Sequence, residues 1–417
     1  MHPPTSGTAP GPLSGIRVLD FTRYVSGPFA TMLLADAGAE VIKVEPHGGE
    51  LTRFQEPMLR PGDAEQVSSY FLRFNRGKKS VELDPRSPAD RPVLEELIRS
   101  ADVLVENFRP GALEKLGLGW ETLRALNPGL IYASISGFGH TDGPLRDMAA
   151  FNLIAEAMAG TVSENPGPDS PPRALGLPFG DSVSSLFAVM GIQQALLERH
   201  RTGLGRRVDV AMYDVMLSMN EMSIALKSMV GHDFNPARPV HDWFAPYGFF
   251  KARDGWLALC VGTDEHWRQL CQVAGWNDLA ADASLARGVD RASVFHGRIS
   301  PRLDAWLSGM DVADAVDLLG RAAVPVAPLQ RPENLLSDEQ AKARDMVVGY
   351  EANGVPFRLA GNPLGIHTGP EAARFATPGQ HNAEVFGPLS GRPERPDSGA
   401  TSVKSAPAAR KEAIRVR

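Results

Sequence analysis

The stretch "GLPFGDSVSSLF" (residues 176–187) holds a single carboxylate, Asp181. The residues after it, "SVSSLFAVMGIQQALLERH", predict one long helix whose first turns are apolar on most sides. An aspartate at the start of a helix is a favoured N-cap, because its side-chain oxygen accepts a hydrogen bond from an unpaired backbone N–H. A carboxylate is also a nucleophile in covalent catalysis. The local sequence alone favours the N-cap over catalysis.

Several motifs of well-defined chemistry are missing from the sequence. The stretch "DFTRYVSGP" stands where a dinucleotide-binding GxGxxG would follow the first strand, and neither a Walker A phosphate loop nor a GxSxG elbow occurs. The ten histidines contain no HExxH, and a turn hydrogen bond explains the proximity of His140 and Asp142. We therefore expect no metal site, no ATP-driven activation and no serine-hydrolase chemistry.

Composition narrows the class of protein. The 417 residues suggest two domains, or one domain with a large insertion. A content of 43% hydrophobic and 22% charged residues is typical of a soluble globular protein. A net charge of -6 and the lack of a basic stripe argue against nucleic-acid binding. No stretch is long enough to span a membrane, and Cys260 and Cys271 are too few for a disulfide framework. We expect a cytoplasmic protein with reduced thiols and no membrane or nucleic-acid partner.

Short apolar runs alternate with helical patterns in the first half of the chain. This alternation predicts an α/β fold, with a mostly parallel sheet covered on both faces in a Rossmann-like large domain. The predicted strands are residues 16–21, 40–45, 102–107, 130–138 and 206–212. The predicted helices lie in "PFATMLLADA", "PADRPVLEELIRSA", "AFNLIAEAMAG" and the stretch after Asp181.

The pattern changes near residue 230. The stretch "VGHDFNPARPVHDWFAPYG" is irregular and rich in proline and aromatic residues, and "FFKARDGWLALCVG" predicts a β-hairpin that turns at Asp254-Gly255. Helices are expected in "DEHWRQLCQVAGW" and "MDVADAVDLLGRA". The predicted parts are a disordered N-terminus (1–12), the large domain (13–228), a linker or substrate loop (229–246), a smaller α+β domain (247–330), a return to the large domain (331–390) and a disordered tail (391–417).

The order of these segments resembles the class III CoA-transferase family (CaiB/BaiF type), which includes formyl-CoA transferases, carnitine CoA-transferases and α-methylacyl-CoA racemases. The resemblance spans about residues 13–390. It implies a large domain that binds CoA and an interlocked homodimer, in which each chain threads through its partner. The stretches that carry it are "LSGIRVLDFTRYVSGPFATMLLADAGAEVIKVE", "FNRGKKSVELD", "ADVLVENFRPGALEKLGLGWETL", "GDSVSSLFAVMGIQQALLERHRTGLGRRVDVAMYDV" and, more weakly, "APYGFFKARDGWLALCVGTDEHW".

The resemblance implies that Asp181 is the catalytic nucleophile. A carboxylate that attacks the thioester of an acyl-CoA forms an aspartyl anhydride, and the released CoA thiolate then forms an aspartyl-CoA thioester. An acyl-CoA donor and a carboxylate acceptor are the expected partners, with CoA as a substrate and no tightly bound cofactor. The N-terminus of a helix is expected to hold the aspartate ionised.

The resemblance also implies a CoA site. Tyr24, Val25 and Ser26 occupy the turn that lines the pantetheine arm in the family. Lys78 stands at the position of a lysine near the adenosine phosphates, and Lys115 with Leu116 at the adenine-side pair; for either lysine, a solvated surface charge is the alternative. Pro46 replaces a basic residue of some relatives, which leaves the phosphate contacts on that side open.

Two further functions stay open at this point, a 2-methylacyl-CoA racemase and a non-catalytic CoA-binding protein. Matching "AAFNLIAEAMAG" to the helix that carries the racemase histidine places Phe151 at the histidine and Asn152 at the aspartate after it. Phenylalanine cannot transfer a proton, which favours the transferase. Val25 replaces a glutamine of formyl-CoA transferases, and the pair Trp243 and Phe244 suggests a less polar acyl group than oxalate.

Overall fold

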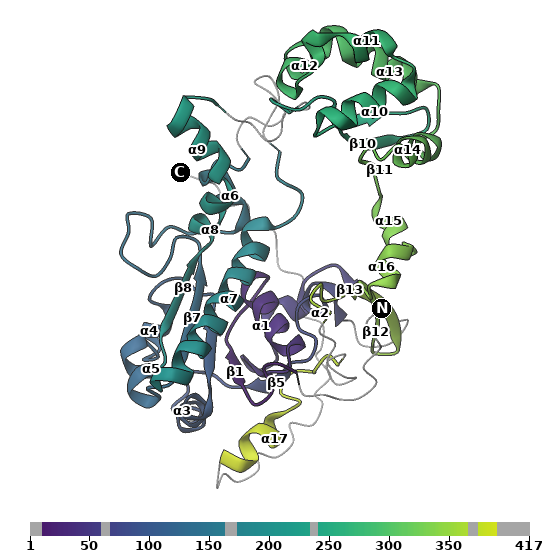
Figure 1. Cartoon of the computed structure of the whole chain (residues 1–417). Helices are drawn as coiled ribbons and strands as arrows, with labels where there is room; N and C mark the ends of the chain where they lie inside the picture. The colour runs from purple at the N-terminus through teal and green to yellow at the C-terminus, as the bar shows by residue number, and fades with distance from the viewer. Residues whose placement is uncertain (1–10, 60–66, 163–172, 234–240, 366–373, 390–417) are drawn as a thin grey trace, which may run out of the picture.

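The structure is a computed structural model of the whole chain, and it describes residues 11–59, 67–162, 173–233, 241–365 and 374–389. Figure 1 shows a large lobe, built on a central sheet, and a smaller lobe made mostly of helices. The tail predicted to be disordered (391–417) and nearly all of the N-terminal segment lie outside the described residues. No helix within the described ranges is both long and apolar enough to cross a membrane.

The central sheet has six parallel strands in the order β5-β2-β1-β6-β7-β8. All five predicted strands are confirmed, because a parallel strand buried on both faces is a continuous apolar run. The sixth, β5, was not predicted from the sequence. The strands are β1 (Arg17–Asp20), β2 (Glu40–Glu45), β5 (Lys79–Glu82), β6 (Val103–Glu106), β7 (Ile131–Ser136) and β8 (Arg207–Ala211).

The strand order creates a switch point between β1 and β6. From β1 the chain builds the sheet outward through β2 to β5, and it then returns to the other side of β1 for β6. In open α/β sheets of this kind, the connections leave the carboxyl ends of the two central strands in opposite directions and open a crevice there. The Rossmann-like prediction is confirmed, and the fold places a ligand site at the ends of β1 and β6.

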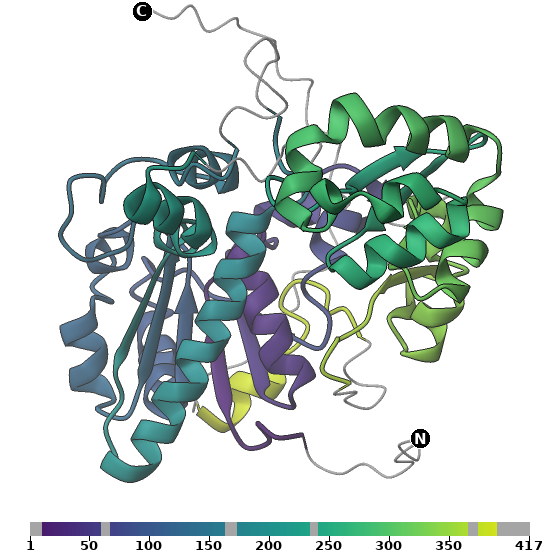
Figure 2. The same ribbon diagram turned by 45° about the horizontal axis from the view of Figure 1, so that its top comes forward.

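Helices cover both faces of the sheet, as expected. On one face α1 (Ser26–Asp36) and α7 (Phe179–Thr202) lie side by side, as Figure 2 shows, and pack on alternate strand residues such as Val18 and Val103. On the other face the intervening residues, such as Leu19 and Leu104, pack against α3 (Arg91–Ser100), α4 (Ala112–Lys115) and α5 (Trp120–Leu126). Beside α7 lie α6 (Asn152–Met158) and α8 (Met212–Met219), and α9 (Glu221–Val230) follows α8 along the chain.

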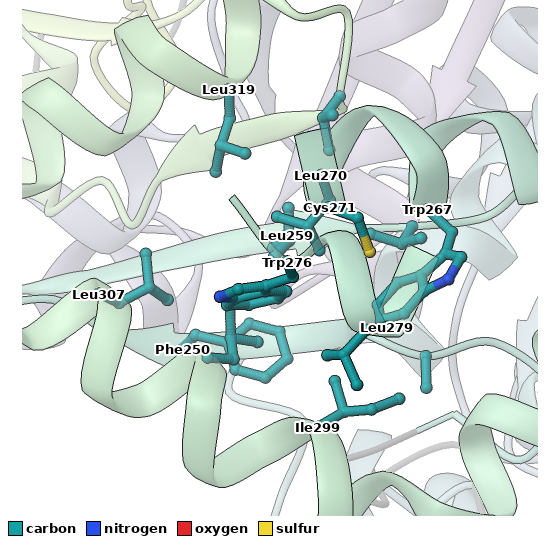
Figure 3. Close-up of a cluster of buried hydrophobic side chains, with 14 of the residues drawn as sticks. Phe250, Leu259, Trp267, Leu270, Cys271, Trp276, Leu279, Ile299, Leu307 and Leu319 are labelled. Atoms are coloured by element: carbon teal, nitrogen blue, oxygen red, sulfur yellow. The ribbon is translucent and has the colours of Figure 1, made fainter. Parts of the chain in front are cut away.

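The small lobe has its own hydrophobic core, which Figure 3 shows. The predicted hairpin is confirmed as β9 (Tyr247–Lys251) paired with β10 (Trp256–Cys260), and β11 (Val326–Pro328) adds a third antiparallel strand. Cys271 is buried in this core, and both cysteines are free thiols. The helices of the lobe are α10 (Asp264–Ala274), α11 (Asn277–Ala281), α12 (Gly288–Val294), α13 (Ser300–Ser308) and α14 (Val312–Arg321), so both predicted helices are present.

After the small lobe the chain returns to the outer strand of the central sheet. The backbone N–H groups of Ser80 and Glu82, in β5, donate to His381 Nδ1 (3.1 Å) and Asn382 Oδ1 (2.9 Å). The exact domain boundaries remain a prediction. The returning elements are α15 (Pro332–Leu335), α16 (Glu339–Ala343), the hairpin β12 (Val347–Ala352) with β13 (Val355–Ala360), and α17 (Asn382–Phe386).

Candidate active site

Asp181 lies within the first turn of α7 rather than at its N-cap. The helix begins at Phe179, and Pro178 stands at the N-cap without a side-chain cap. The N–H of Ser182 already donates to the carbonyl of Pro178 (2.8 Å), so Asp181 is the third residue of the helix and lies in its first turn. The N-cap prediction is therefore wrong, and the carboxylate is not needed to satisfy a backbone N–H of its own helix.

The environment of Asp181 favours its neutral form. Burial raises the pKa of this carboxyl to about 6, and the nearby charge of Glu156 acts in the same direction, while a hydrogen bond with the side chain of Ser26 opposes them. The start of the helix therefore does not lower the pKa of Asp181 below its ordinary value, although a carboxyl group with a pKa of about 6 is still ionised at neutral pH. Two N–H groups of the first turn are already occupied, since Phe179 donates to Glu156 Oε1 (3.1 Å) and Asp181 donates to Asn152 Oδ1 (3.1 Å).

The turn after β1 meets the start of α7. Ser26 is the first residue of α1, and Ser185 Oγ lies within hydrogen-bonding distance of the carbonyls of Ser26 (2.6 Å) and Asp181 (2.8 Å). Tyr24 has a left-handed backbone conformation (φ 66°). A Cβ on Gly27 would lie 2.3 Å from Thr22, so only glycine permits this tight turn. The structure brings the turn of Tyr24, Val25 and Ser26 next to Asp181.

Aromatic side chains border the same place. The rings of Tyr24 and Phe151 meet edge-on with centroids 6.0 Å apart, and Phe151 is 71% exposed at the N-cap of α6. Tyr70, in the short helix α2 (Ser69–Leu72), has a raised pKa, chiefly through burial and in part through the charge of Asp181. Sequence reasoning missed both Tyr70 and Glu156. Glu156 is the one charged residue of α6, and that was the signal available in the sequence.

A pocket of about 360 Å³ lies at the carboxyl ends of β1, β2, β5 and β6, at the switch point of the sheet. Leu116 lines it, as does Pro46, whereas Lys115 is exposed and is not among the lining residues. Its cations are the guanidinium groups of Arg23, which lies over the Phe108 ring (5.2 Å), and Arg86. The other lining residues are Phe21, Val44, Glu45, Leu83, Asp84, Pro85, Ala112 and Leu113.

One loop connects this pocket to Asp181. Arg23 exchanges two hydrogen bonds with the side chain of Asn107, which follows β6 (N to Oδ1 2.8 Å; Nδ2 to the Arg23 carbonyl 2.7 Å). Asn107 Nδ2 also lies 3.4 Å from Ser26 Oγ. The loop after β1 therefore borders the pocket at Arg23 and contacts Asp181 through Ser26.

Lys78 is not a surface residue. It is buried, and its ammonium donates to Asp20 Oδ2 (2.9 Å), the Pro28 carbonyl (3.0 Å) and Asn75 Oδ1 (2.9 Å). Burial lowers the pKa of Lys78 to about 8 against the opposing effect of Asp20. The alternative of a solvated charge is wrong for this lysine. With three acceptors around it, Lys78 supports the core of the domain, and this geometry lends no support to a phosphate contact.

The described residues contain no group of three or more His, Cys, Asp or Glu side chains that could hold a metal ion. The sequence itself matches the profile of a family described as CoA-transferase family III over residues 13–382. The chain belongs to CoA-transferase family III. The resemblance drawn from the sequence motifs is thereby confirmed.

Relatives of this CoA-transferase carry related names. This chain is 38% identical over 365 residues to a succinyl-CoA:mesaconate CoA-transferase of Haloarcula hispanica, and the aligned region covers 85% of this chain and 90% of that protein. It is 38% identical over 360 residues to an acetyl-CoA:oxalate CoA-transferase of Acetobacter aceti, covering 85% and 89%. A CAIB/BAIF family protein from Brucella suis has a similar crystal structure (TM-score 0.80, 31% identity), covering 92% of this chain and 100% of that one.

Proposed function

We propose that this CoA-transferase moves CoA between two carboxylic acids through covalent intermediates on Asp181. The observation that carries the proposal is a partly buried carboxylate at the start of α7, next to the loop that borders a pocket at the switch point. A carboxyl group with a pKa of about 6 is ionised at neutral pH and is more basic than an ordinary aspartate. Basicity of this kind favours nucleophilic attack on a thioester.

In the first step an oxygen of Asp181 attacks the thioester carbonyl of the donor. A C–O bond forms and the C–S bond breaks, which leaves an aspartyl anhydride and a CoA thiolate. The thiolate attacks the aspartyl carbonyl and releases the donor acid as a carboxylate. The acceptor carboxylate then attacks the aspartyl-CoA thioester, which forms a second anhydride and releases the CoA thiolate. The thiolate attacks the acceptor's carbonyl, which gives the product acyl-CoA and releases Asp181 as a carboxylate. Each step exchanges one acyl bond for another, so no external energy source is consumed.

The pocket supports a location for the adenosine end of CoA. Phe108 and Leu116 offer apolar surface for a base, while Arg23 and Arg86 offer charge for phosphates. The pantetheine arm would then pass Tyr24, Val25 and Ser26 on its way to Asp181. Lys115 at the edge of this region stays a prediction. Four relatives are named for succinyl-CoA or succinate, which makes succinyl-CoA the first donor to test.

The decisive experiment is incubation with succinyl-CoA followed by mass spectrometry of the intact protein. The intact wild type should gain the mass of CoA less one water, digestion should locate the adduct on the peptide that contains Asp181, and Asp181→Ala should show neither. Full turnover by Asp181→Ala with a confirmed donor and acceptor would refute the proposal. A protein that binds acyl-CoA without forming an adduct would instead be a non-catalytic CoA-binding protein.

The proposed assembly is an interlocked homodimer. Apolar side chains remain exposed on both lobes, for example Met229 (80%) on α9 and Phe249 (62%) on the sheet of the small lobe. Surfaces of this kind favour burial against a partner. Light scattering should give the mass of a dimer at micromolar concentration, and a stable monomer would exclude this assembly.

A further inference from the structure

Glu156 is a buried carboxylate directly behind the nucleophile. Its side chain is 0% exposed, although α6, the helix that carries it, has no other charged residue. Substrate cannot reach it, since the exposed side of α6 is formed by residues such as Phe151 and Leu153. Any effect of Glu156 on the reaction must therefore pass through other residues.

Two hydrogen bonds connect Glu156 to the start of α7. Its Oε1 accepts from Asn152 Nδ2 (2.9 Å) and from the N–H of Phe179 (3.1 Å). Asn152 in turn accepts from the N–H of Asp181 through Oδ1 (3.1 Å). The two helices touch here, because a Cβ on Gly180 would lie 2.9 Å from Asn152 Oδ1. Glu156 and Asn152 thus occupy two N–H groups of the turn that bears the nucleophile.

The charge of Glu156 has no counterpart in the part of the chain that the structure describes. Its Oε2 is buried without a hydrogen-bond partner, and no cation forms an ion pair with it. Burying an unpaired carboxylate is costly. A glutamine could accept the same two hydrogen bonds without that cost, so the hydrogen bonds alone do not account for a glutamate at this position.

We propose that Glu156 is a positioning residue for the transfer reaction. It holds the first turn of α7 through Asn152, and it prevents the positive end of this helix from stabilising the anionic form of Asp181. The inference rests on the proposed function of Asp181 as nucleophile. Free N–H groups at a helix start stabilise an anion and would make the carboxylate a weaker base. A nearby negative charge has the opposite effect, so the nucleophile stays basic.

Few other ionisable groups bear on Asp181. Tyr70 lies in α2, and its pKa responds to the charge of Asp181; Arg73, directly after α2, acts on Tyr70 in the opposite direction. Tyr24 lies on the turn after β1 and also acts on Tyr70. Among the causes of the raised pKa of Asp181, the one charged group is Glu156. Among single substitutions near Asp181, removal of the charge of Glu156 is therefore expected to shift the pKa of Asp181 the most.

The test is the pH dependence of CoA-adduct formation in a single turnover with succinyl-CoA. Glu156→Gln preserves the two hydrogen-bond acceptances and removes the charge. In this variant we expect the acid limb, which is the rise of the adduct-formation rate with pH, to move to lower pH by at least about 0.5 unit. Such a shift is roughly a threefold change in the ionised fraction of Asp181 below the midpoint. Asn152→Ala keeps the charge and loses the tether, so adduct formation should slow without a downward shift of the limb. Glu106→Gln, which alters an equally buried carboxylate on β6, is the matched control and should leave the limb in place.

An unshifted limb in a folded Glu156→Gln protein would overturn the proposal. If Glu156→Gln does not fold, Asn152→Asp is the second test. This variant adds a carboxylate beside Asp181 and should move the acid limb to higher pH; an unmoved limb would also contradict the proposal. Carbon-13 NMR of labelled aspartate, assigned by the signal lost in Asp181→Asn, measures the same titration without any reaction. A wild type that forms no adduct would refute the function of Asp181, whereas an Asp181 titration unaffected by Glu156→Gln would refute only the role of Glu156.

Discussion

Replacing Asp181 by asparagine should stabilise the protein while it abolishes transfer. In the folded protein the pKa of Asp181 is raised from 3.8 to about 6, chiefly because burial penalises the charged form. An acidic group whose pKa is raised by folding binds its proton more tightly in the folded protein, so it favours the folded state when it is protonated. That contribution is complete below pH 3.8 and is lost as the pH rises through about 6.

The shift sets the size of the effect. A rise of about 2 units corresponds to about 3 kcal/mol at about 1.4 kcal/mol per unit. The carboxyl group is partly exposed, and solvent screening reduces the effect of burial. The value of about 3 kcal/mol is therefore the upper limit of the loss of stability that the ionised carboxylate causes in the wild type above pH 6. An asparagine has no charge to desolvate and still accepts the hydrogen bond from Ser26. Asp181→Asn should therefore gain up to about 3 kcal/mol at pH 8 and only about 1 kcal/mol at pH 4.5, which is still above the unfolded pKa of 3.8.

The assay is thermal unfolding of both proteins between pH 4.5 and 8, since effects common to both cancel in the difference. A gain of this size corresponds to an increase of several degrees in Tm at pH 8, which shrinks as the pH falls. Asp147→Asn, at an exposed position, controls for the loss of a surface carboxylate and should not reproduce the trend. Equal Tm values for Asp181→Asn and the wild type at every pH would refute the reasoning.

Three other outcomes are expected. A 2-methylacyl-CoA in deuterated water should not exchange its α-hydrogen at an enzymatic rate, because Phe151 cannot act as a general base; rapid exchange that depends on Asp181 would indicate a racemase. Lys78→Met should lower the free energy of unfolding by about 3 to 5 kcal/mol in urea titrations, because it removes the cation that pairs with buried Asp20; an unchanged midpoint would contradict this. Arg291→Met should cost a similar amount in the small lobe, monitored by tryptophan fluorescence, because the buried guanidinium donates to three backbone carbonyls and to a carboxylate.

The sequence predicted most of the central sheet because the strands are buried on both faces. Val18 and Leu19, for example, pack on opposite helical layers, so both are apolar and the run is easily recognised. In β5 the sequence "KSVE" has only one apolar residue. One edge of this strand pairs with the returning chain, some 300 residues later in the sequence. Local pattern carries no information about such a partner.

The site was predictable only in part. Asp181 was identified through family motifs, and local reasoning misplaced it as an N-cap because the helix starts two residues earlier. Lys78 resembled a surface charge because it stands in the basic run "NRGKKS", although Asp20, 58 residues away, holds it in the core. Glu156 raises the pKa of Asp181, and Asp181 raises the pKa of Tyr70, from three separate helices, which only tertiary contacts reveal.

The contact between β5 and the end of the chain has a consequence for biosynthesis. The N–H groups of Ser80 and Glu82 find their acceptors in His381 and Asn382, 301 and 300 residues further on. At a translation rate of about 5 to 20 residues per second, that interval lasts roughly 15 to 60 s. During this time the nascent sheet presents an open edge to any strand nearby, which is a known route to aggregation. The segment at residues 381–382 therefore also protects the open edge of the sheet against mispairing. Premature termination before residue 381 should yield insoluble protein even though Asp181 and the residues that line the pocket have been made.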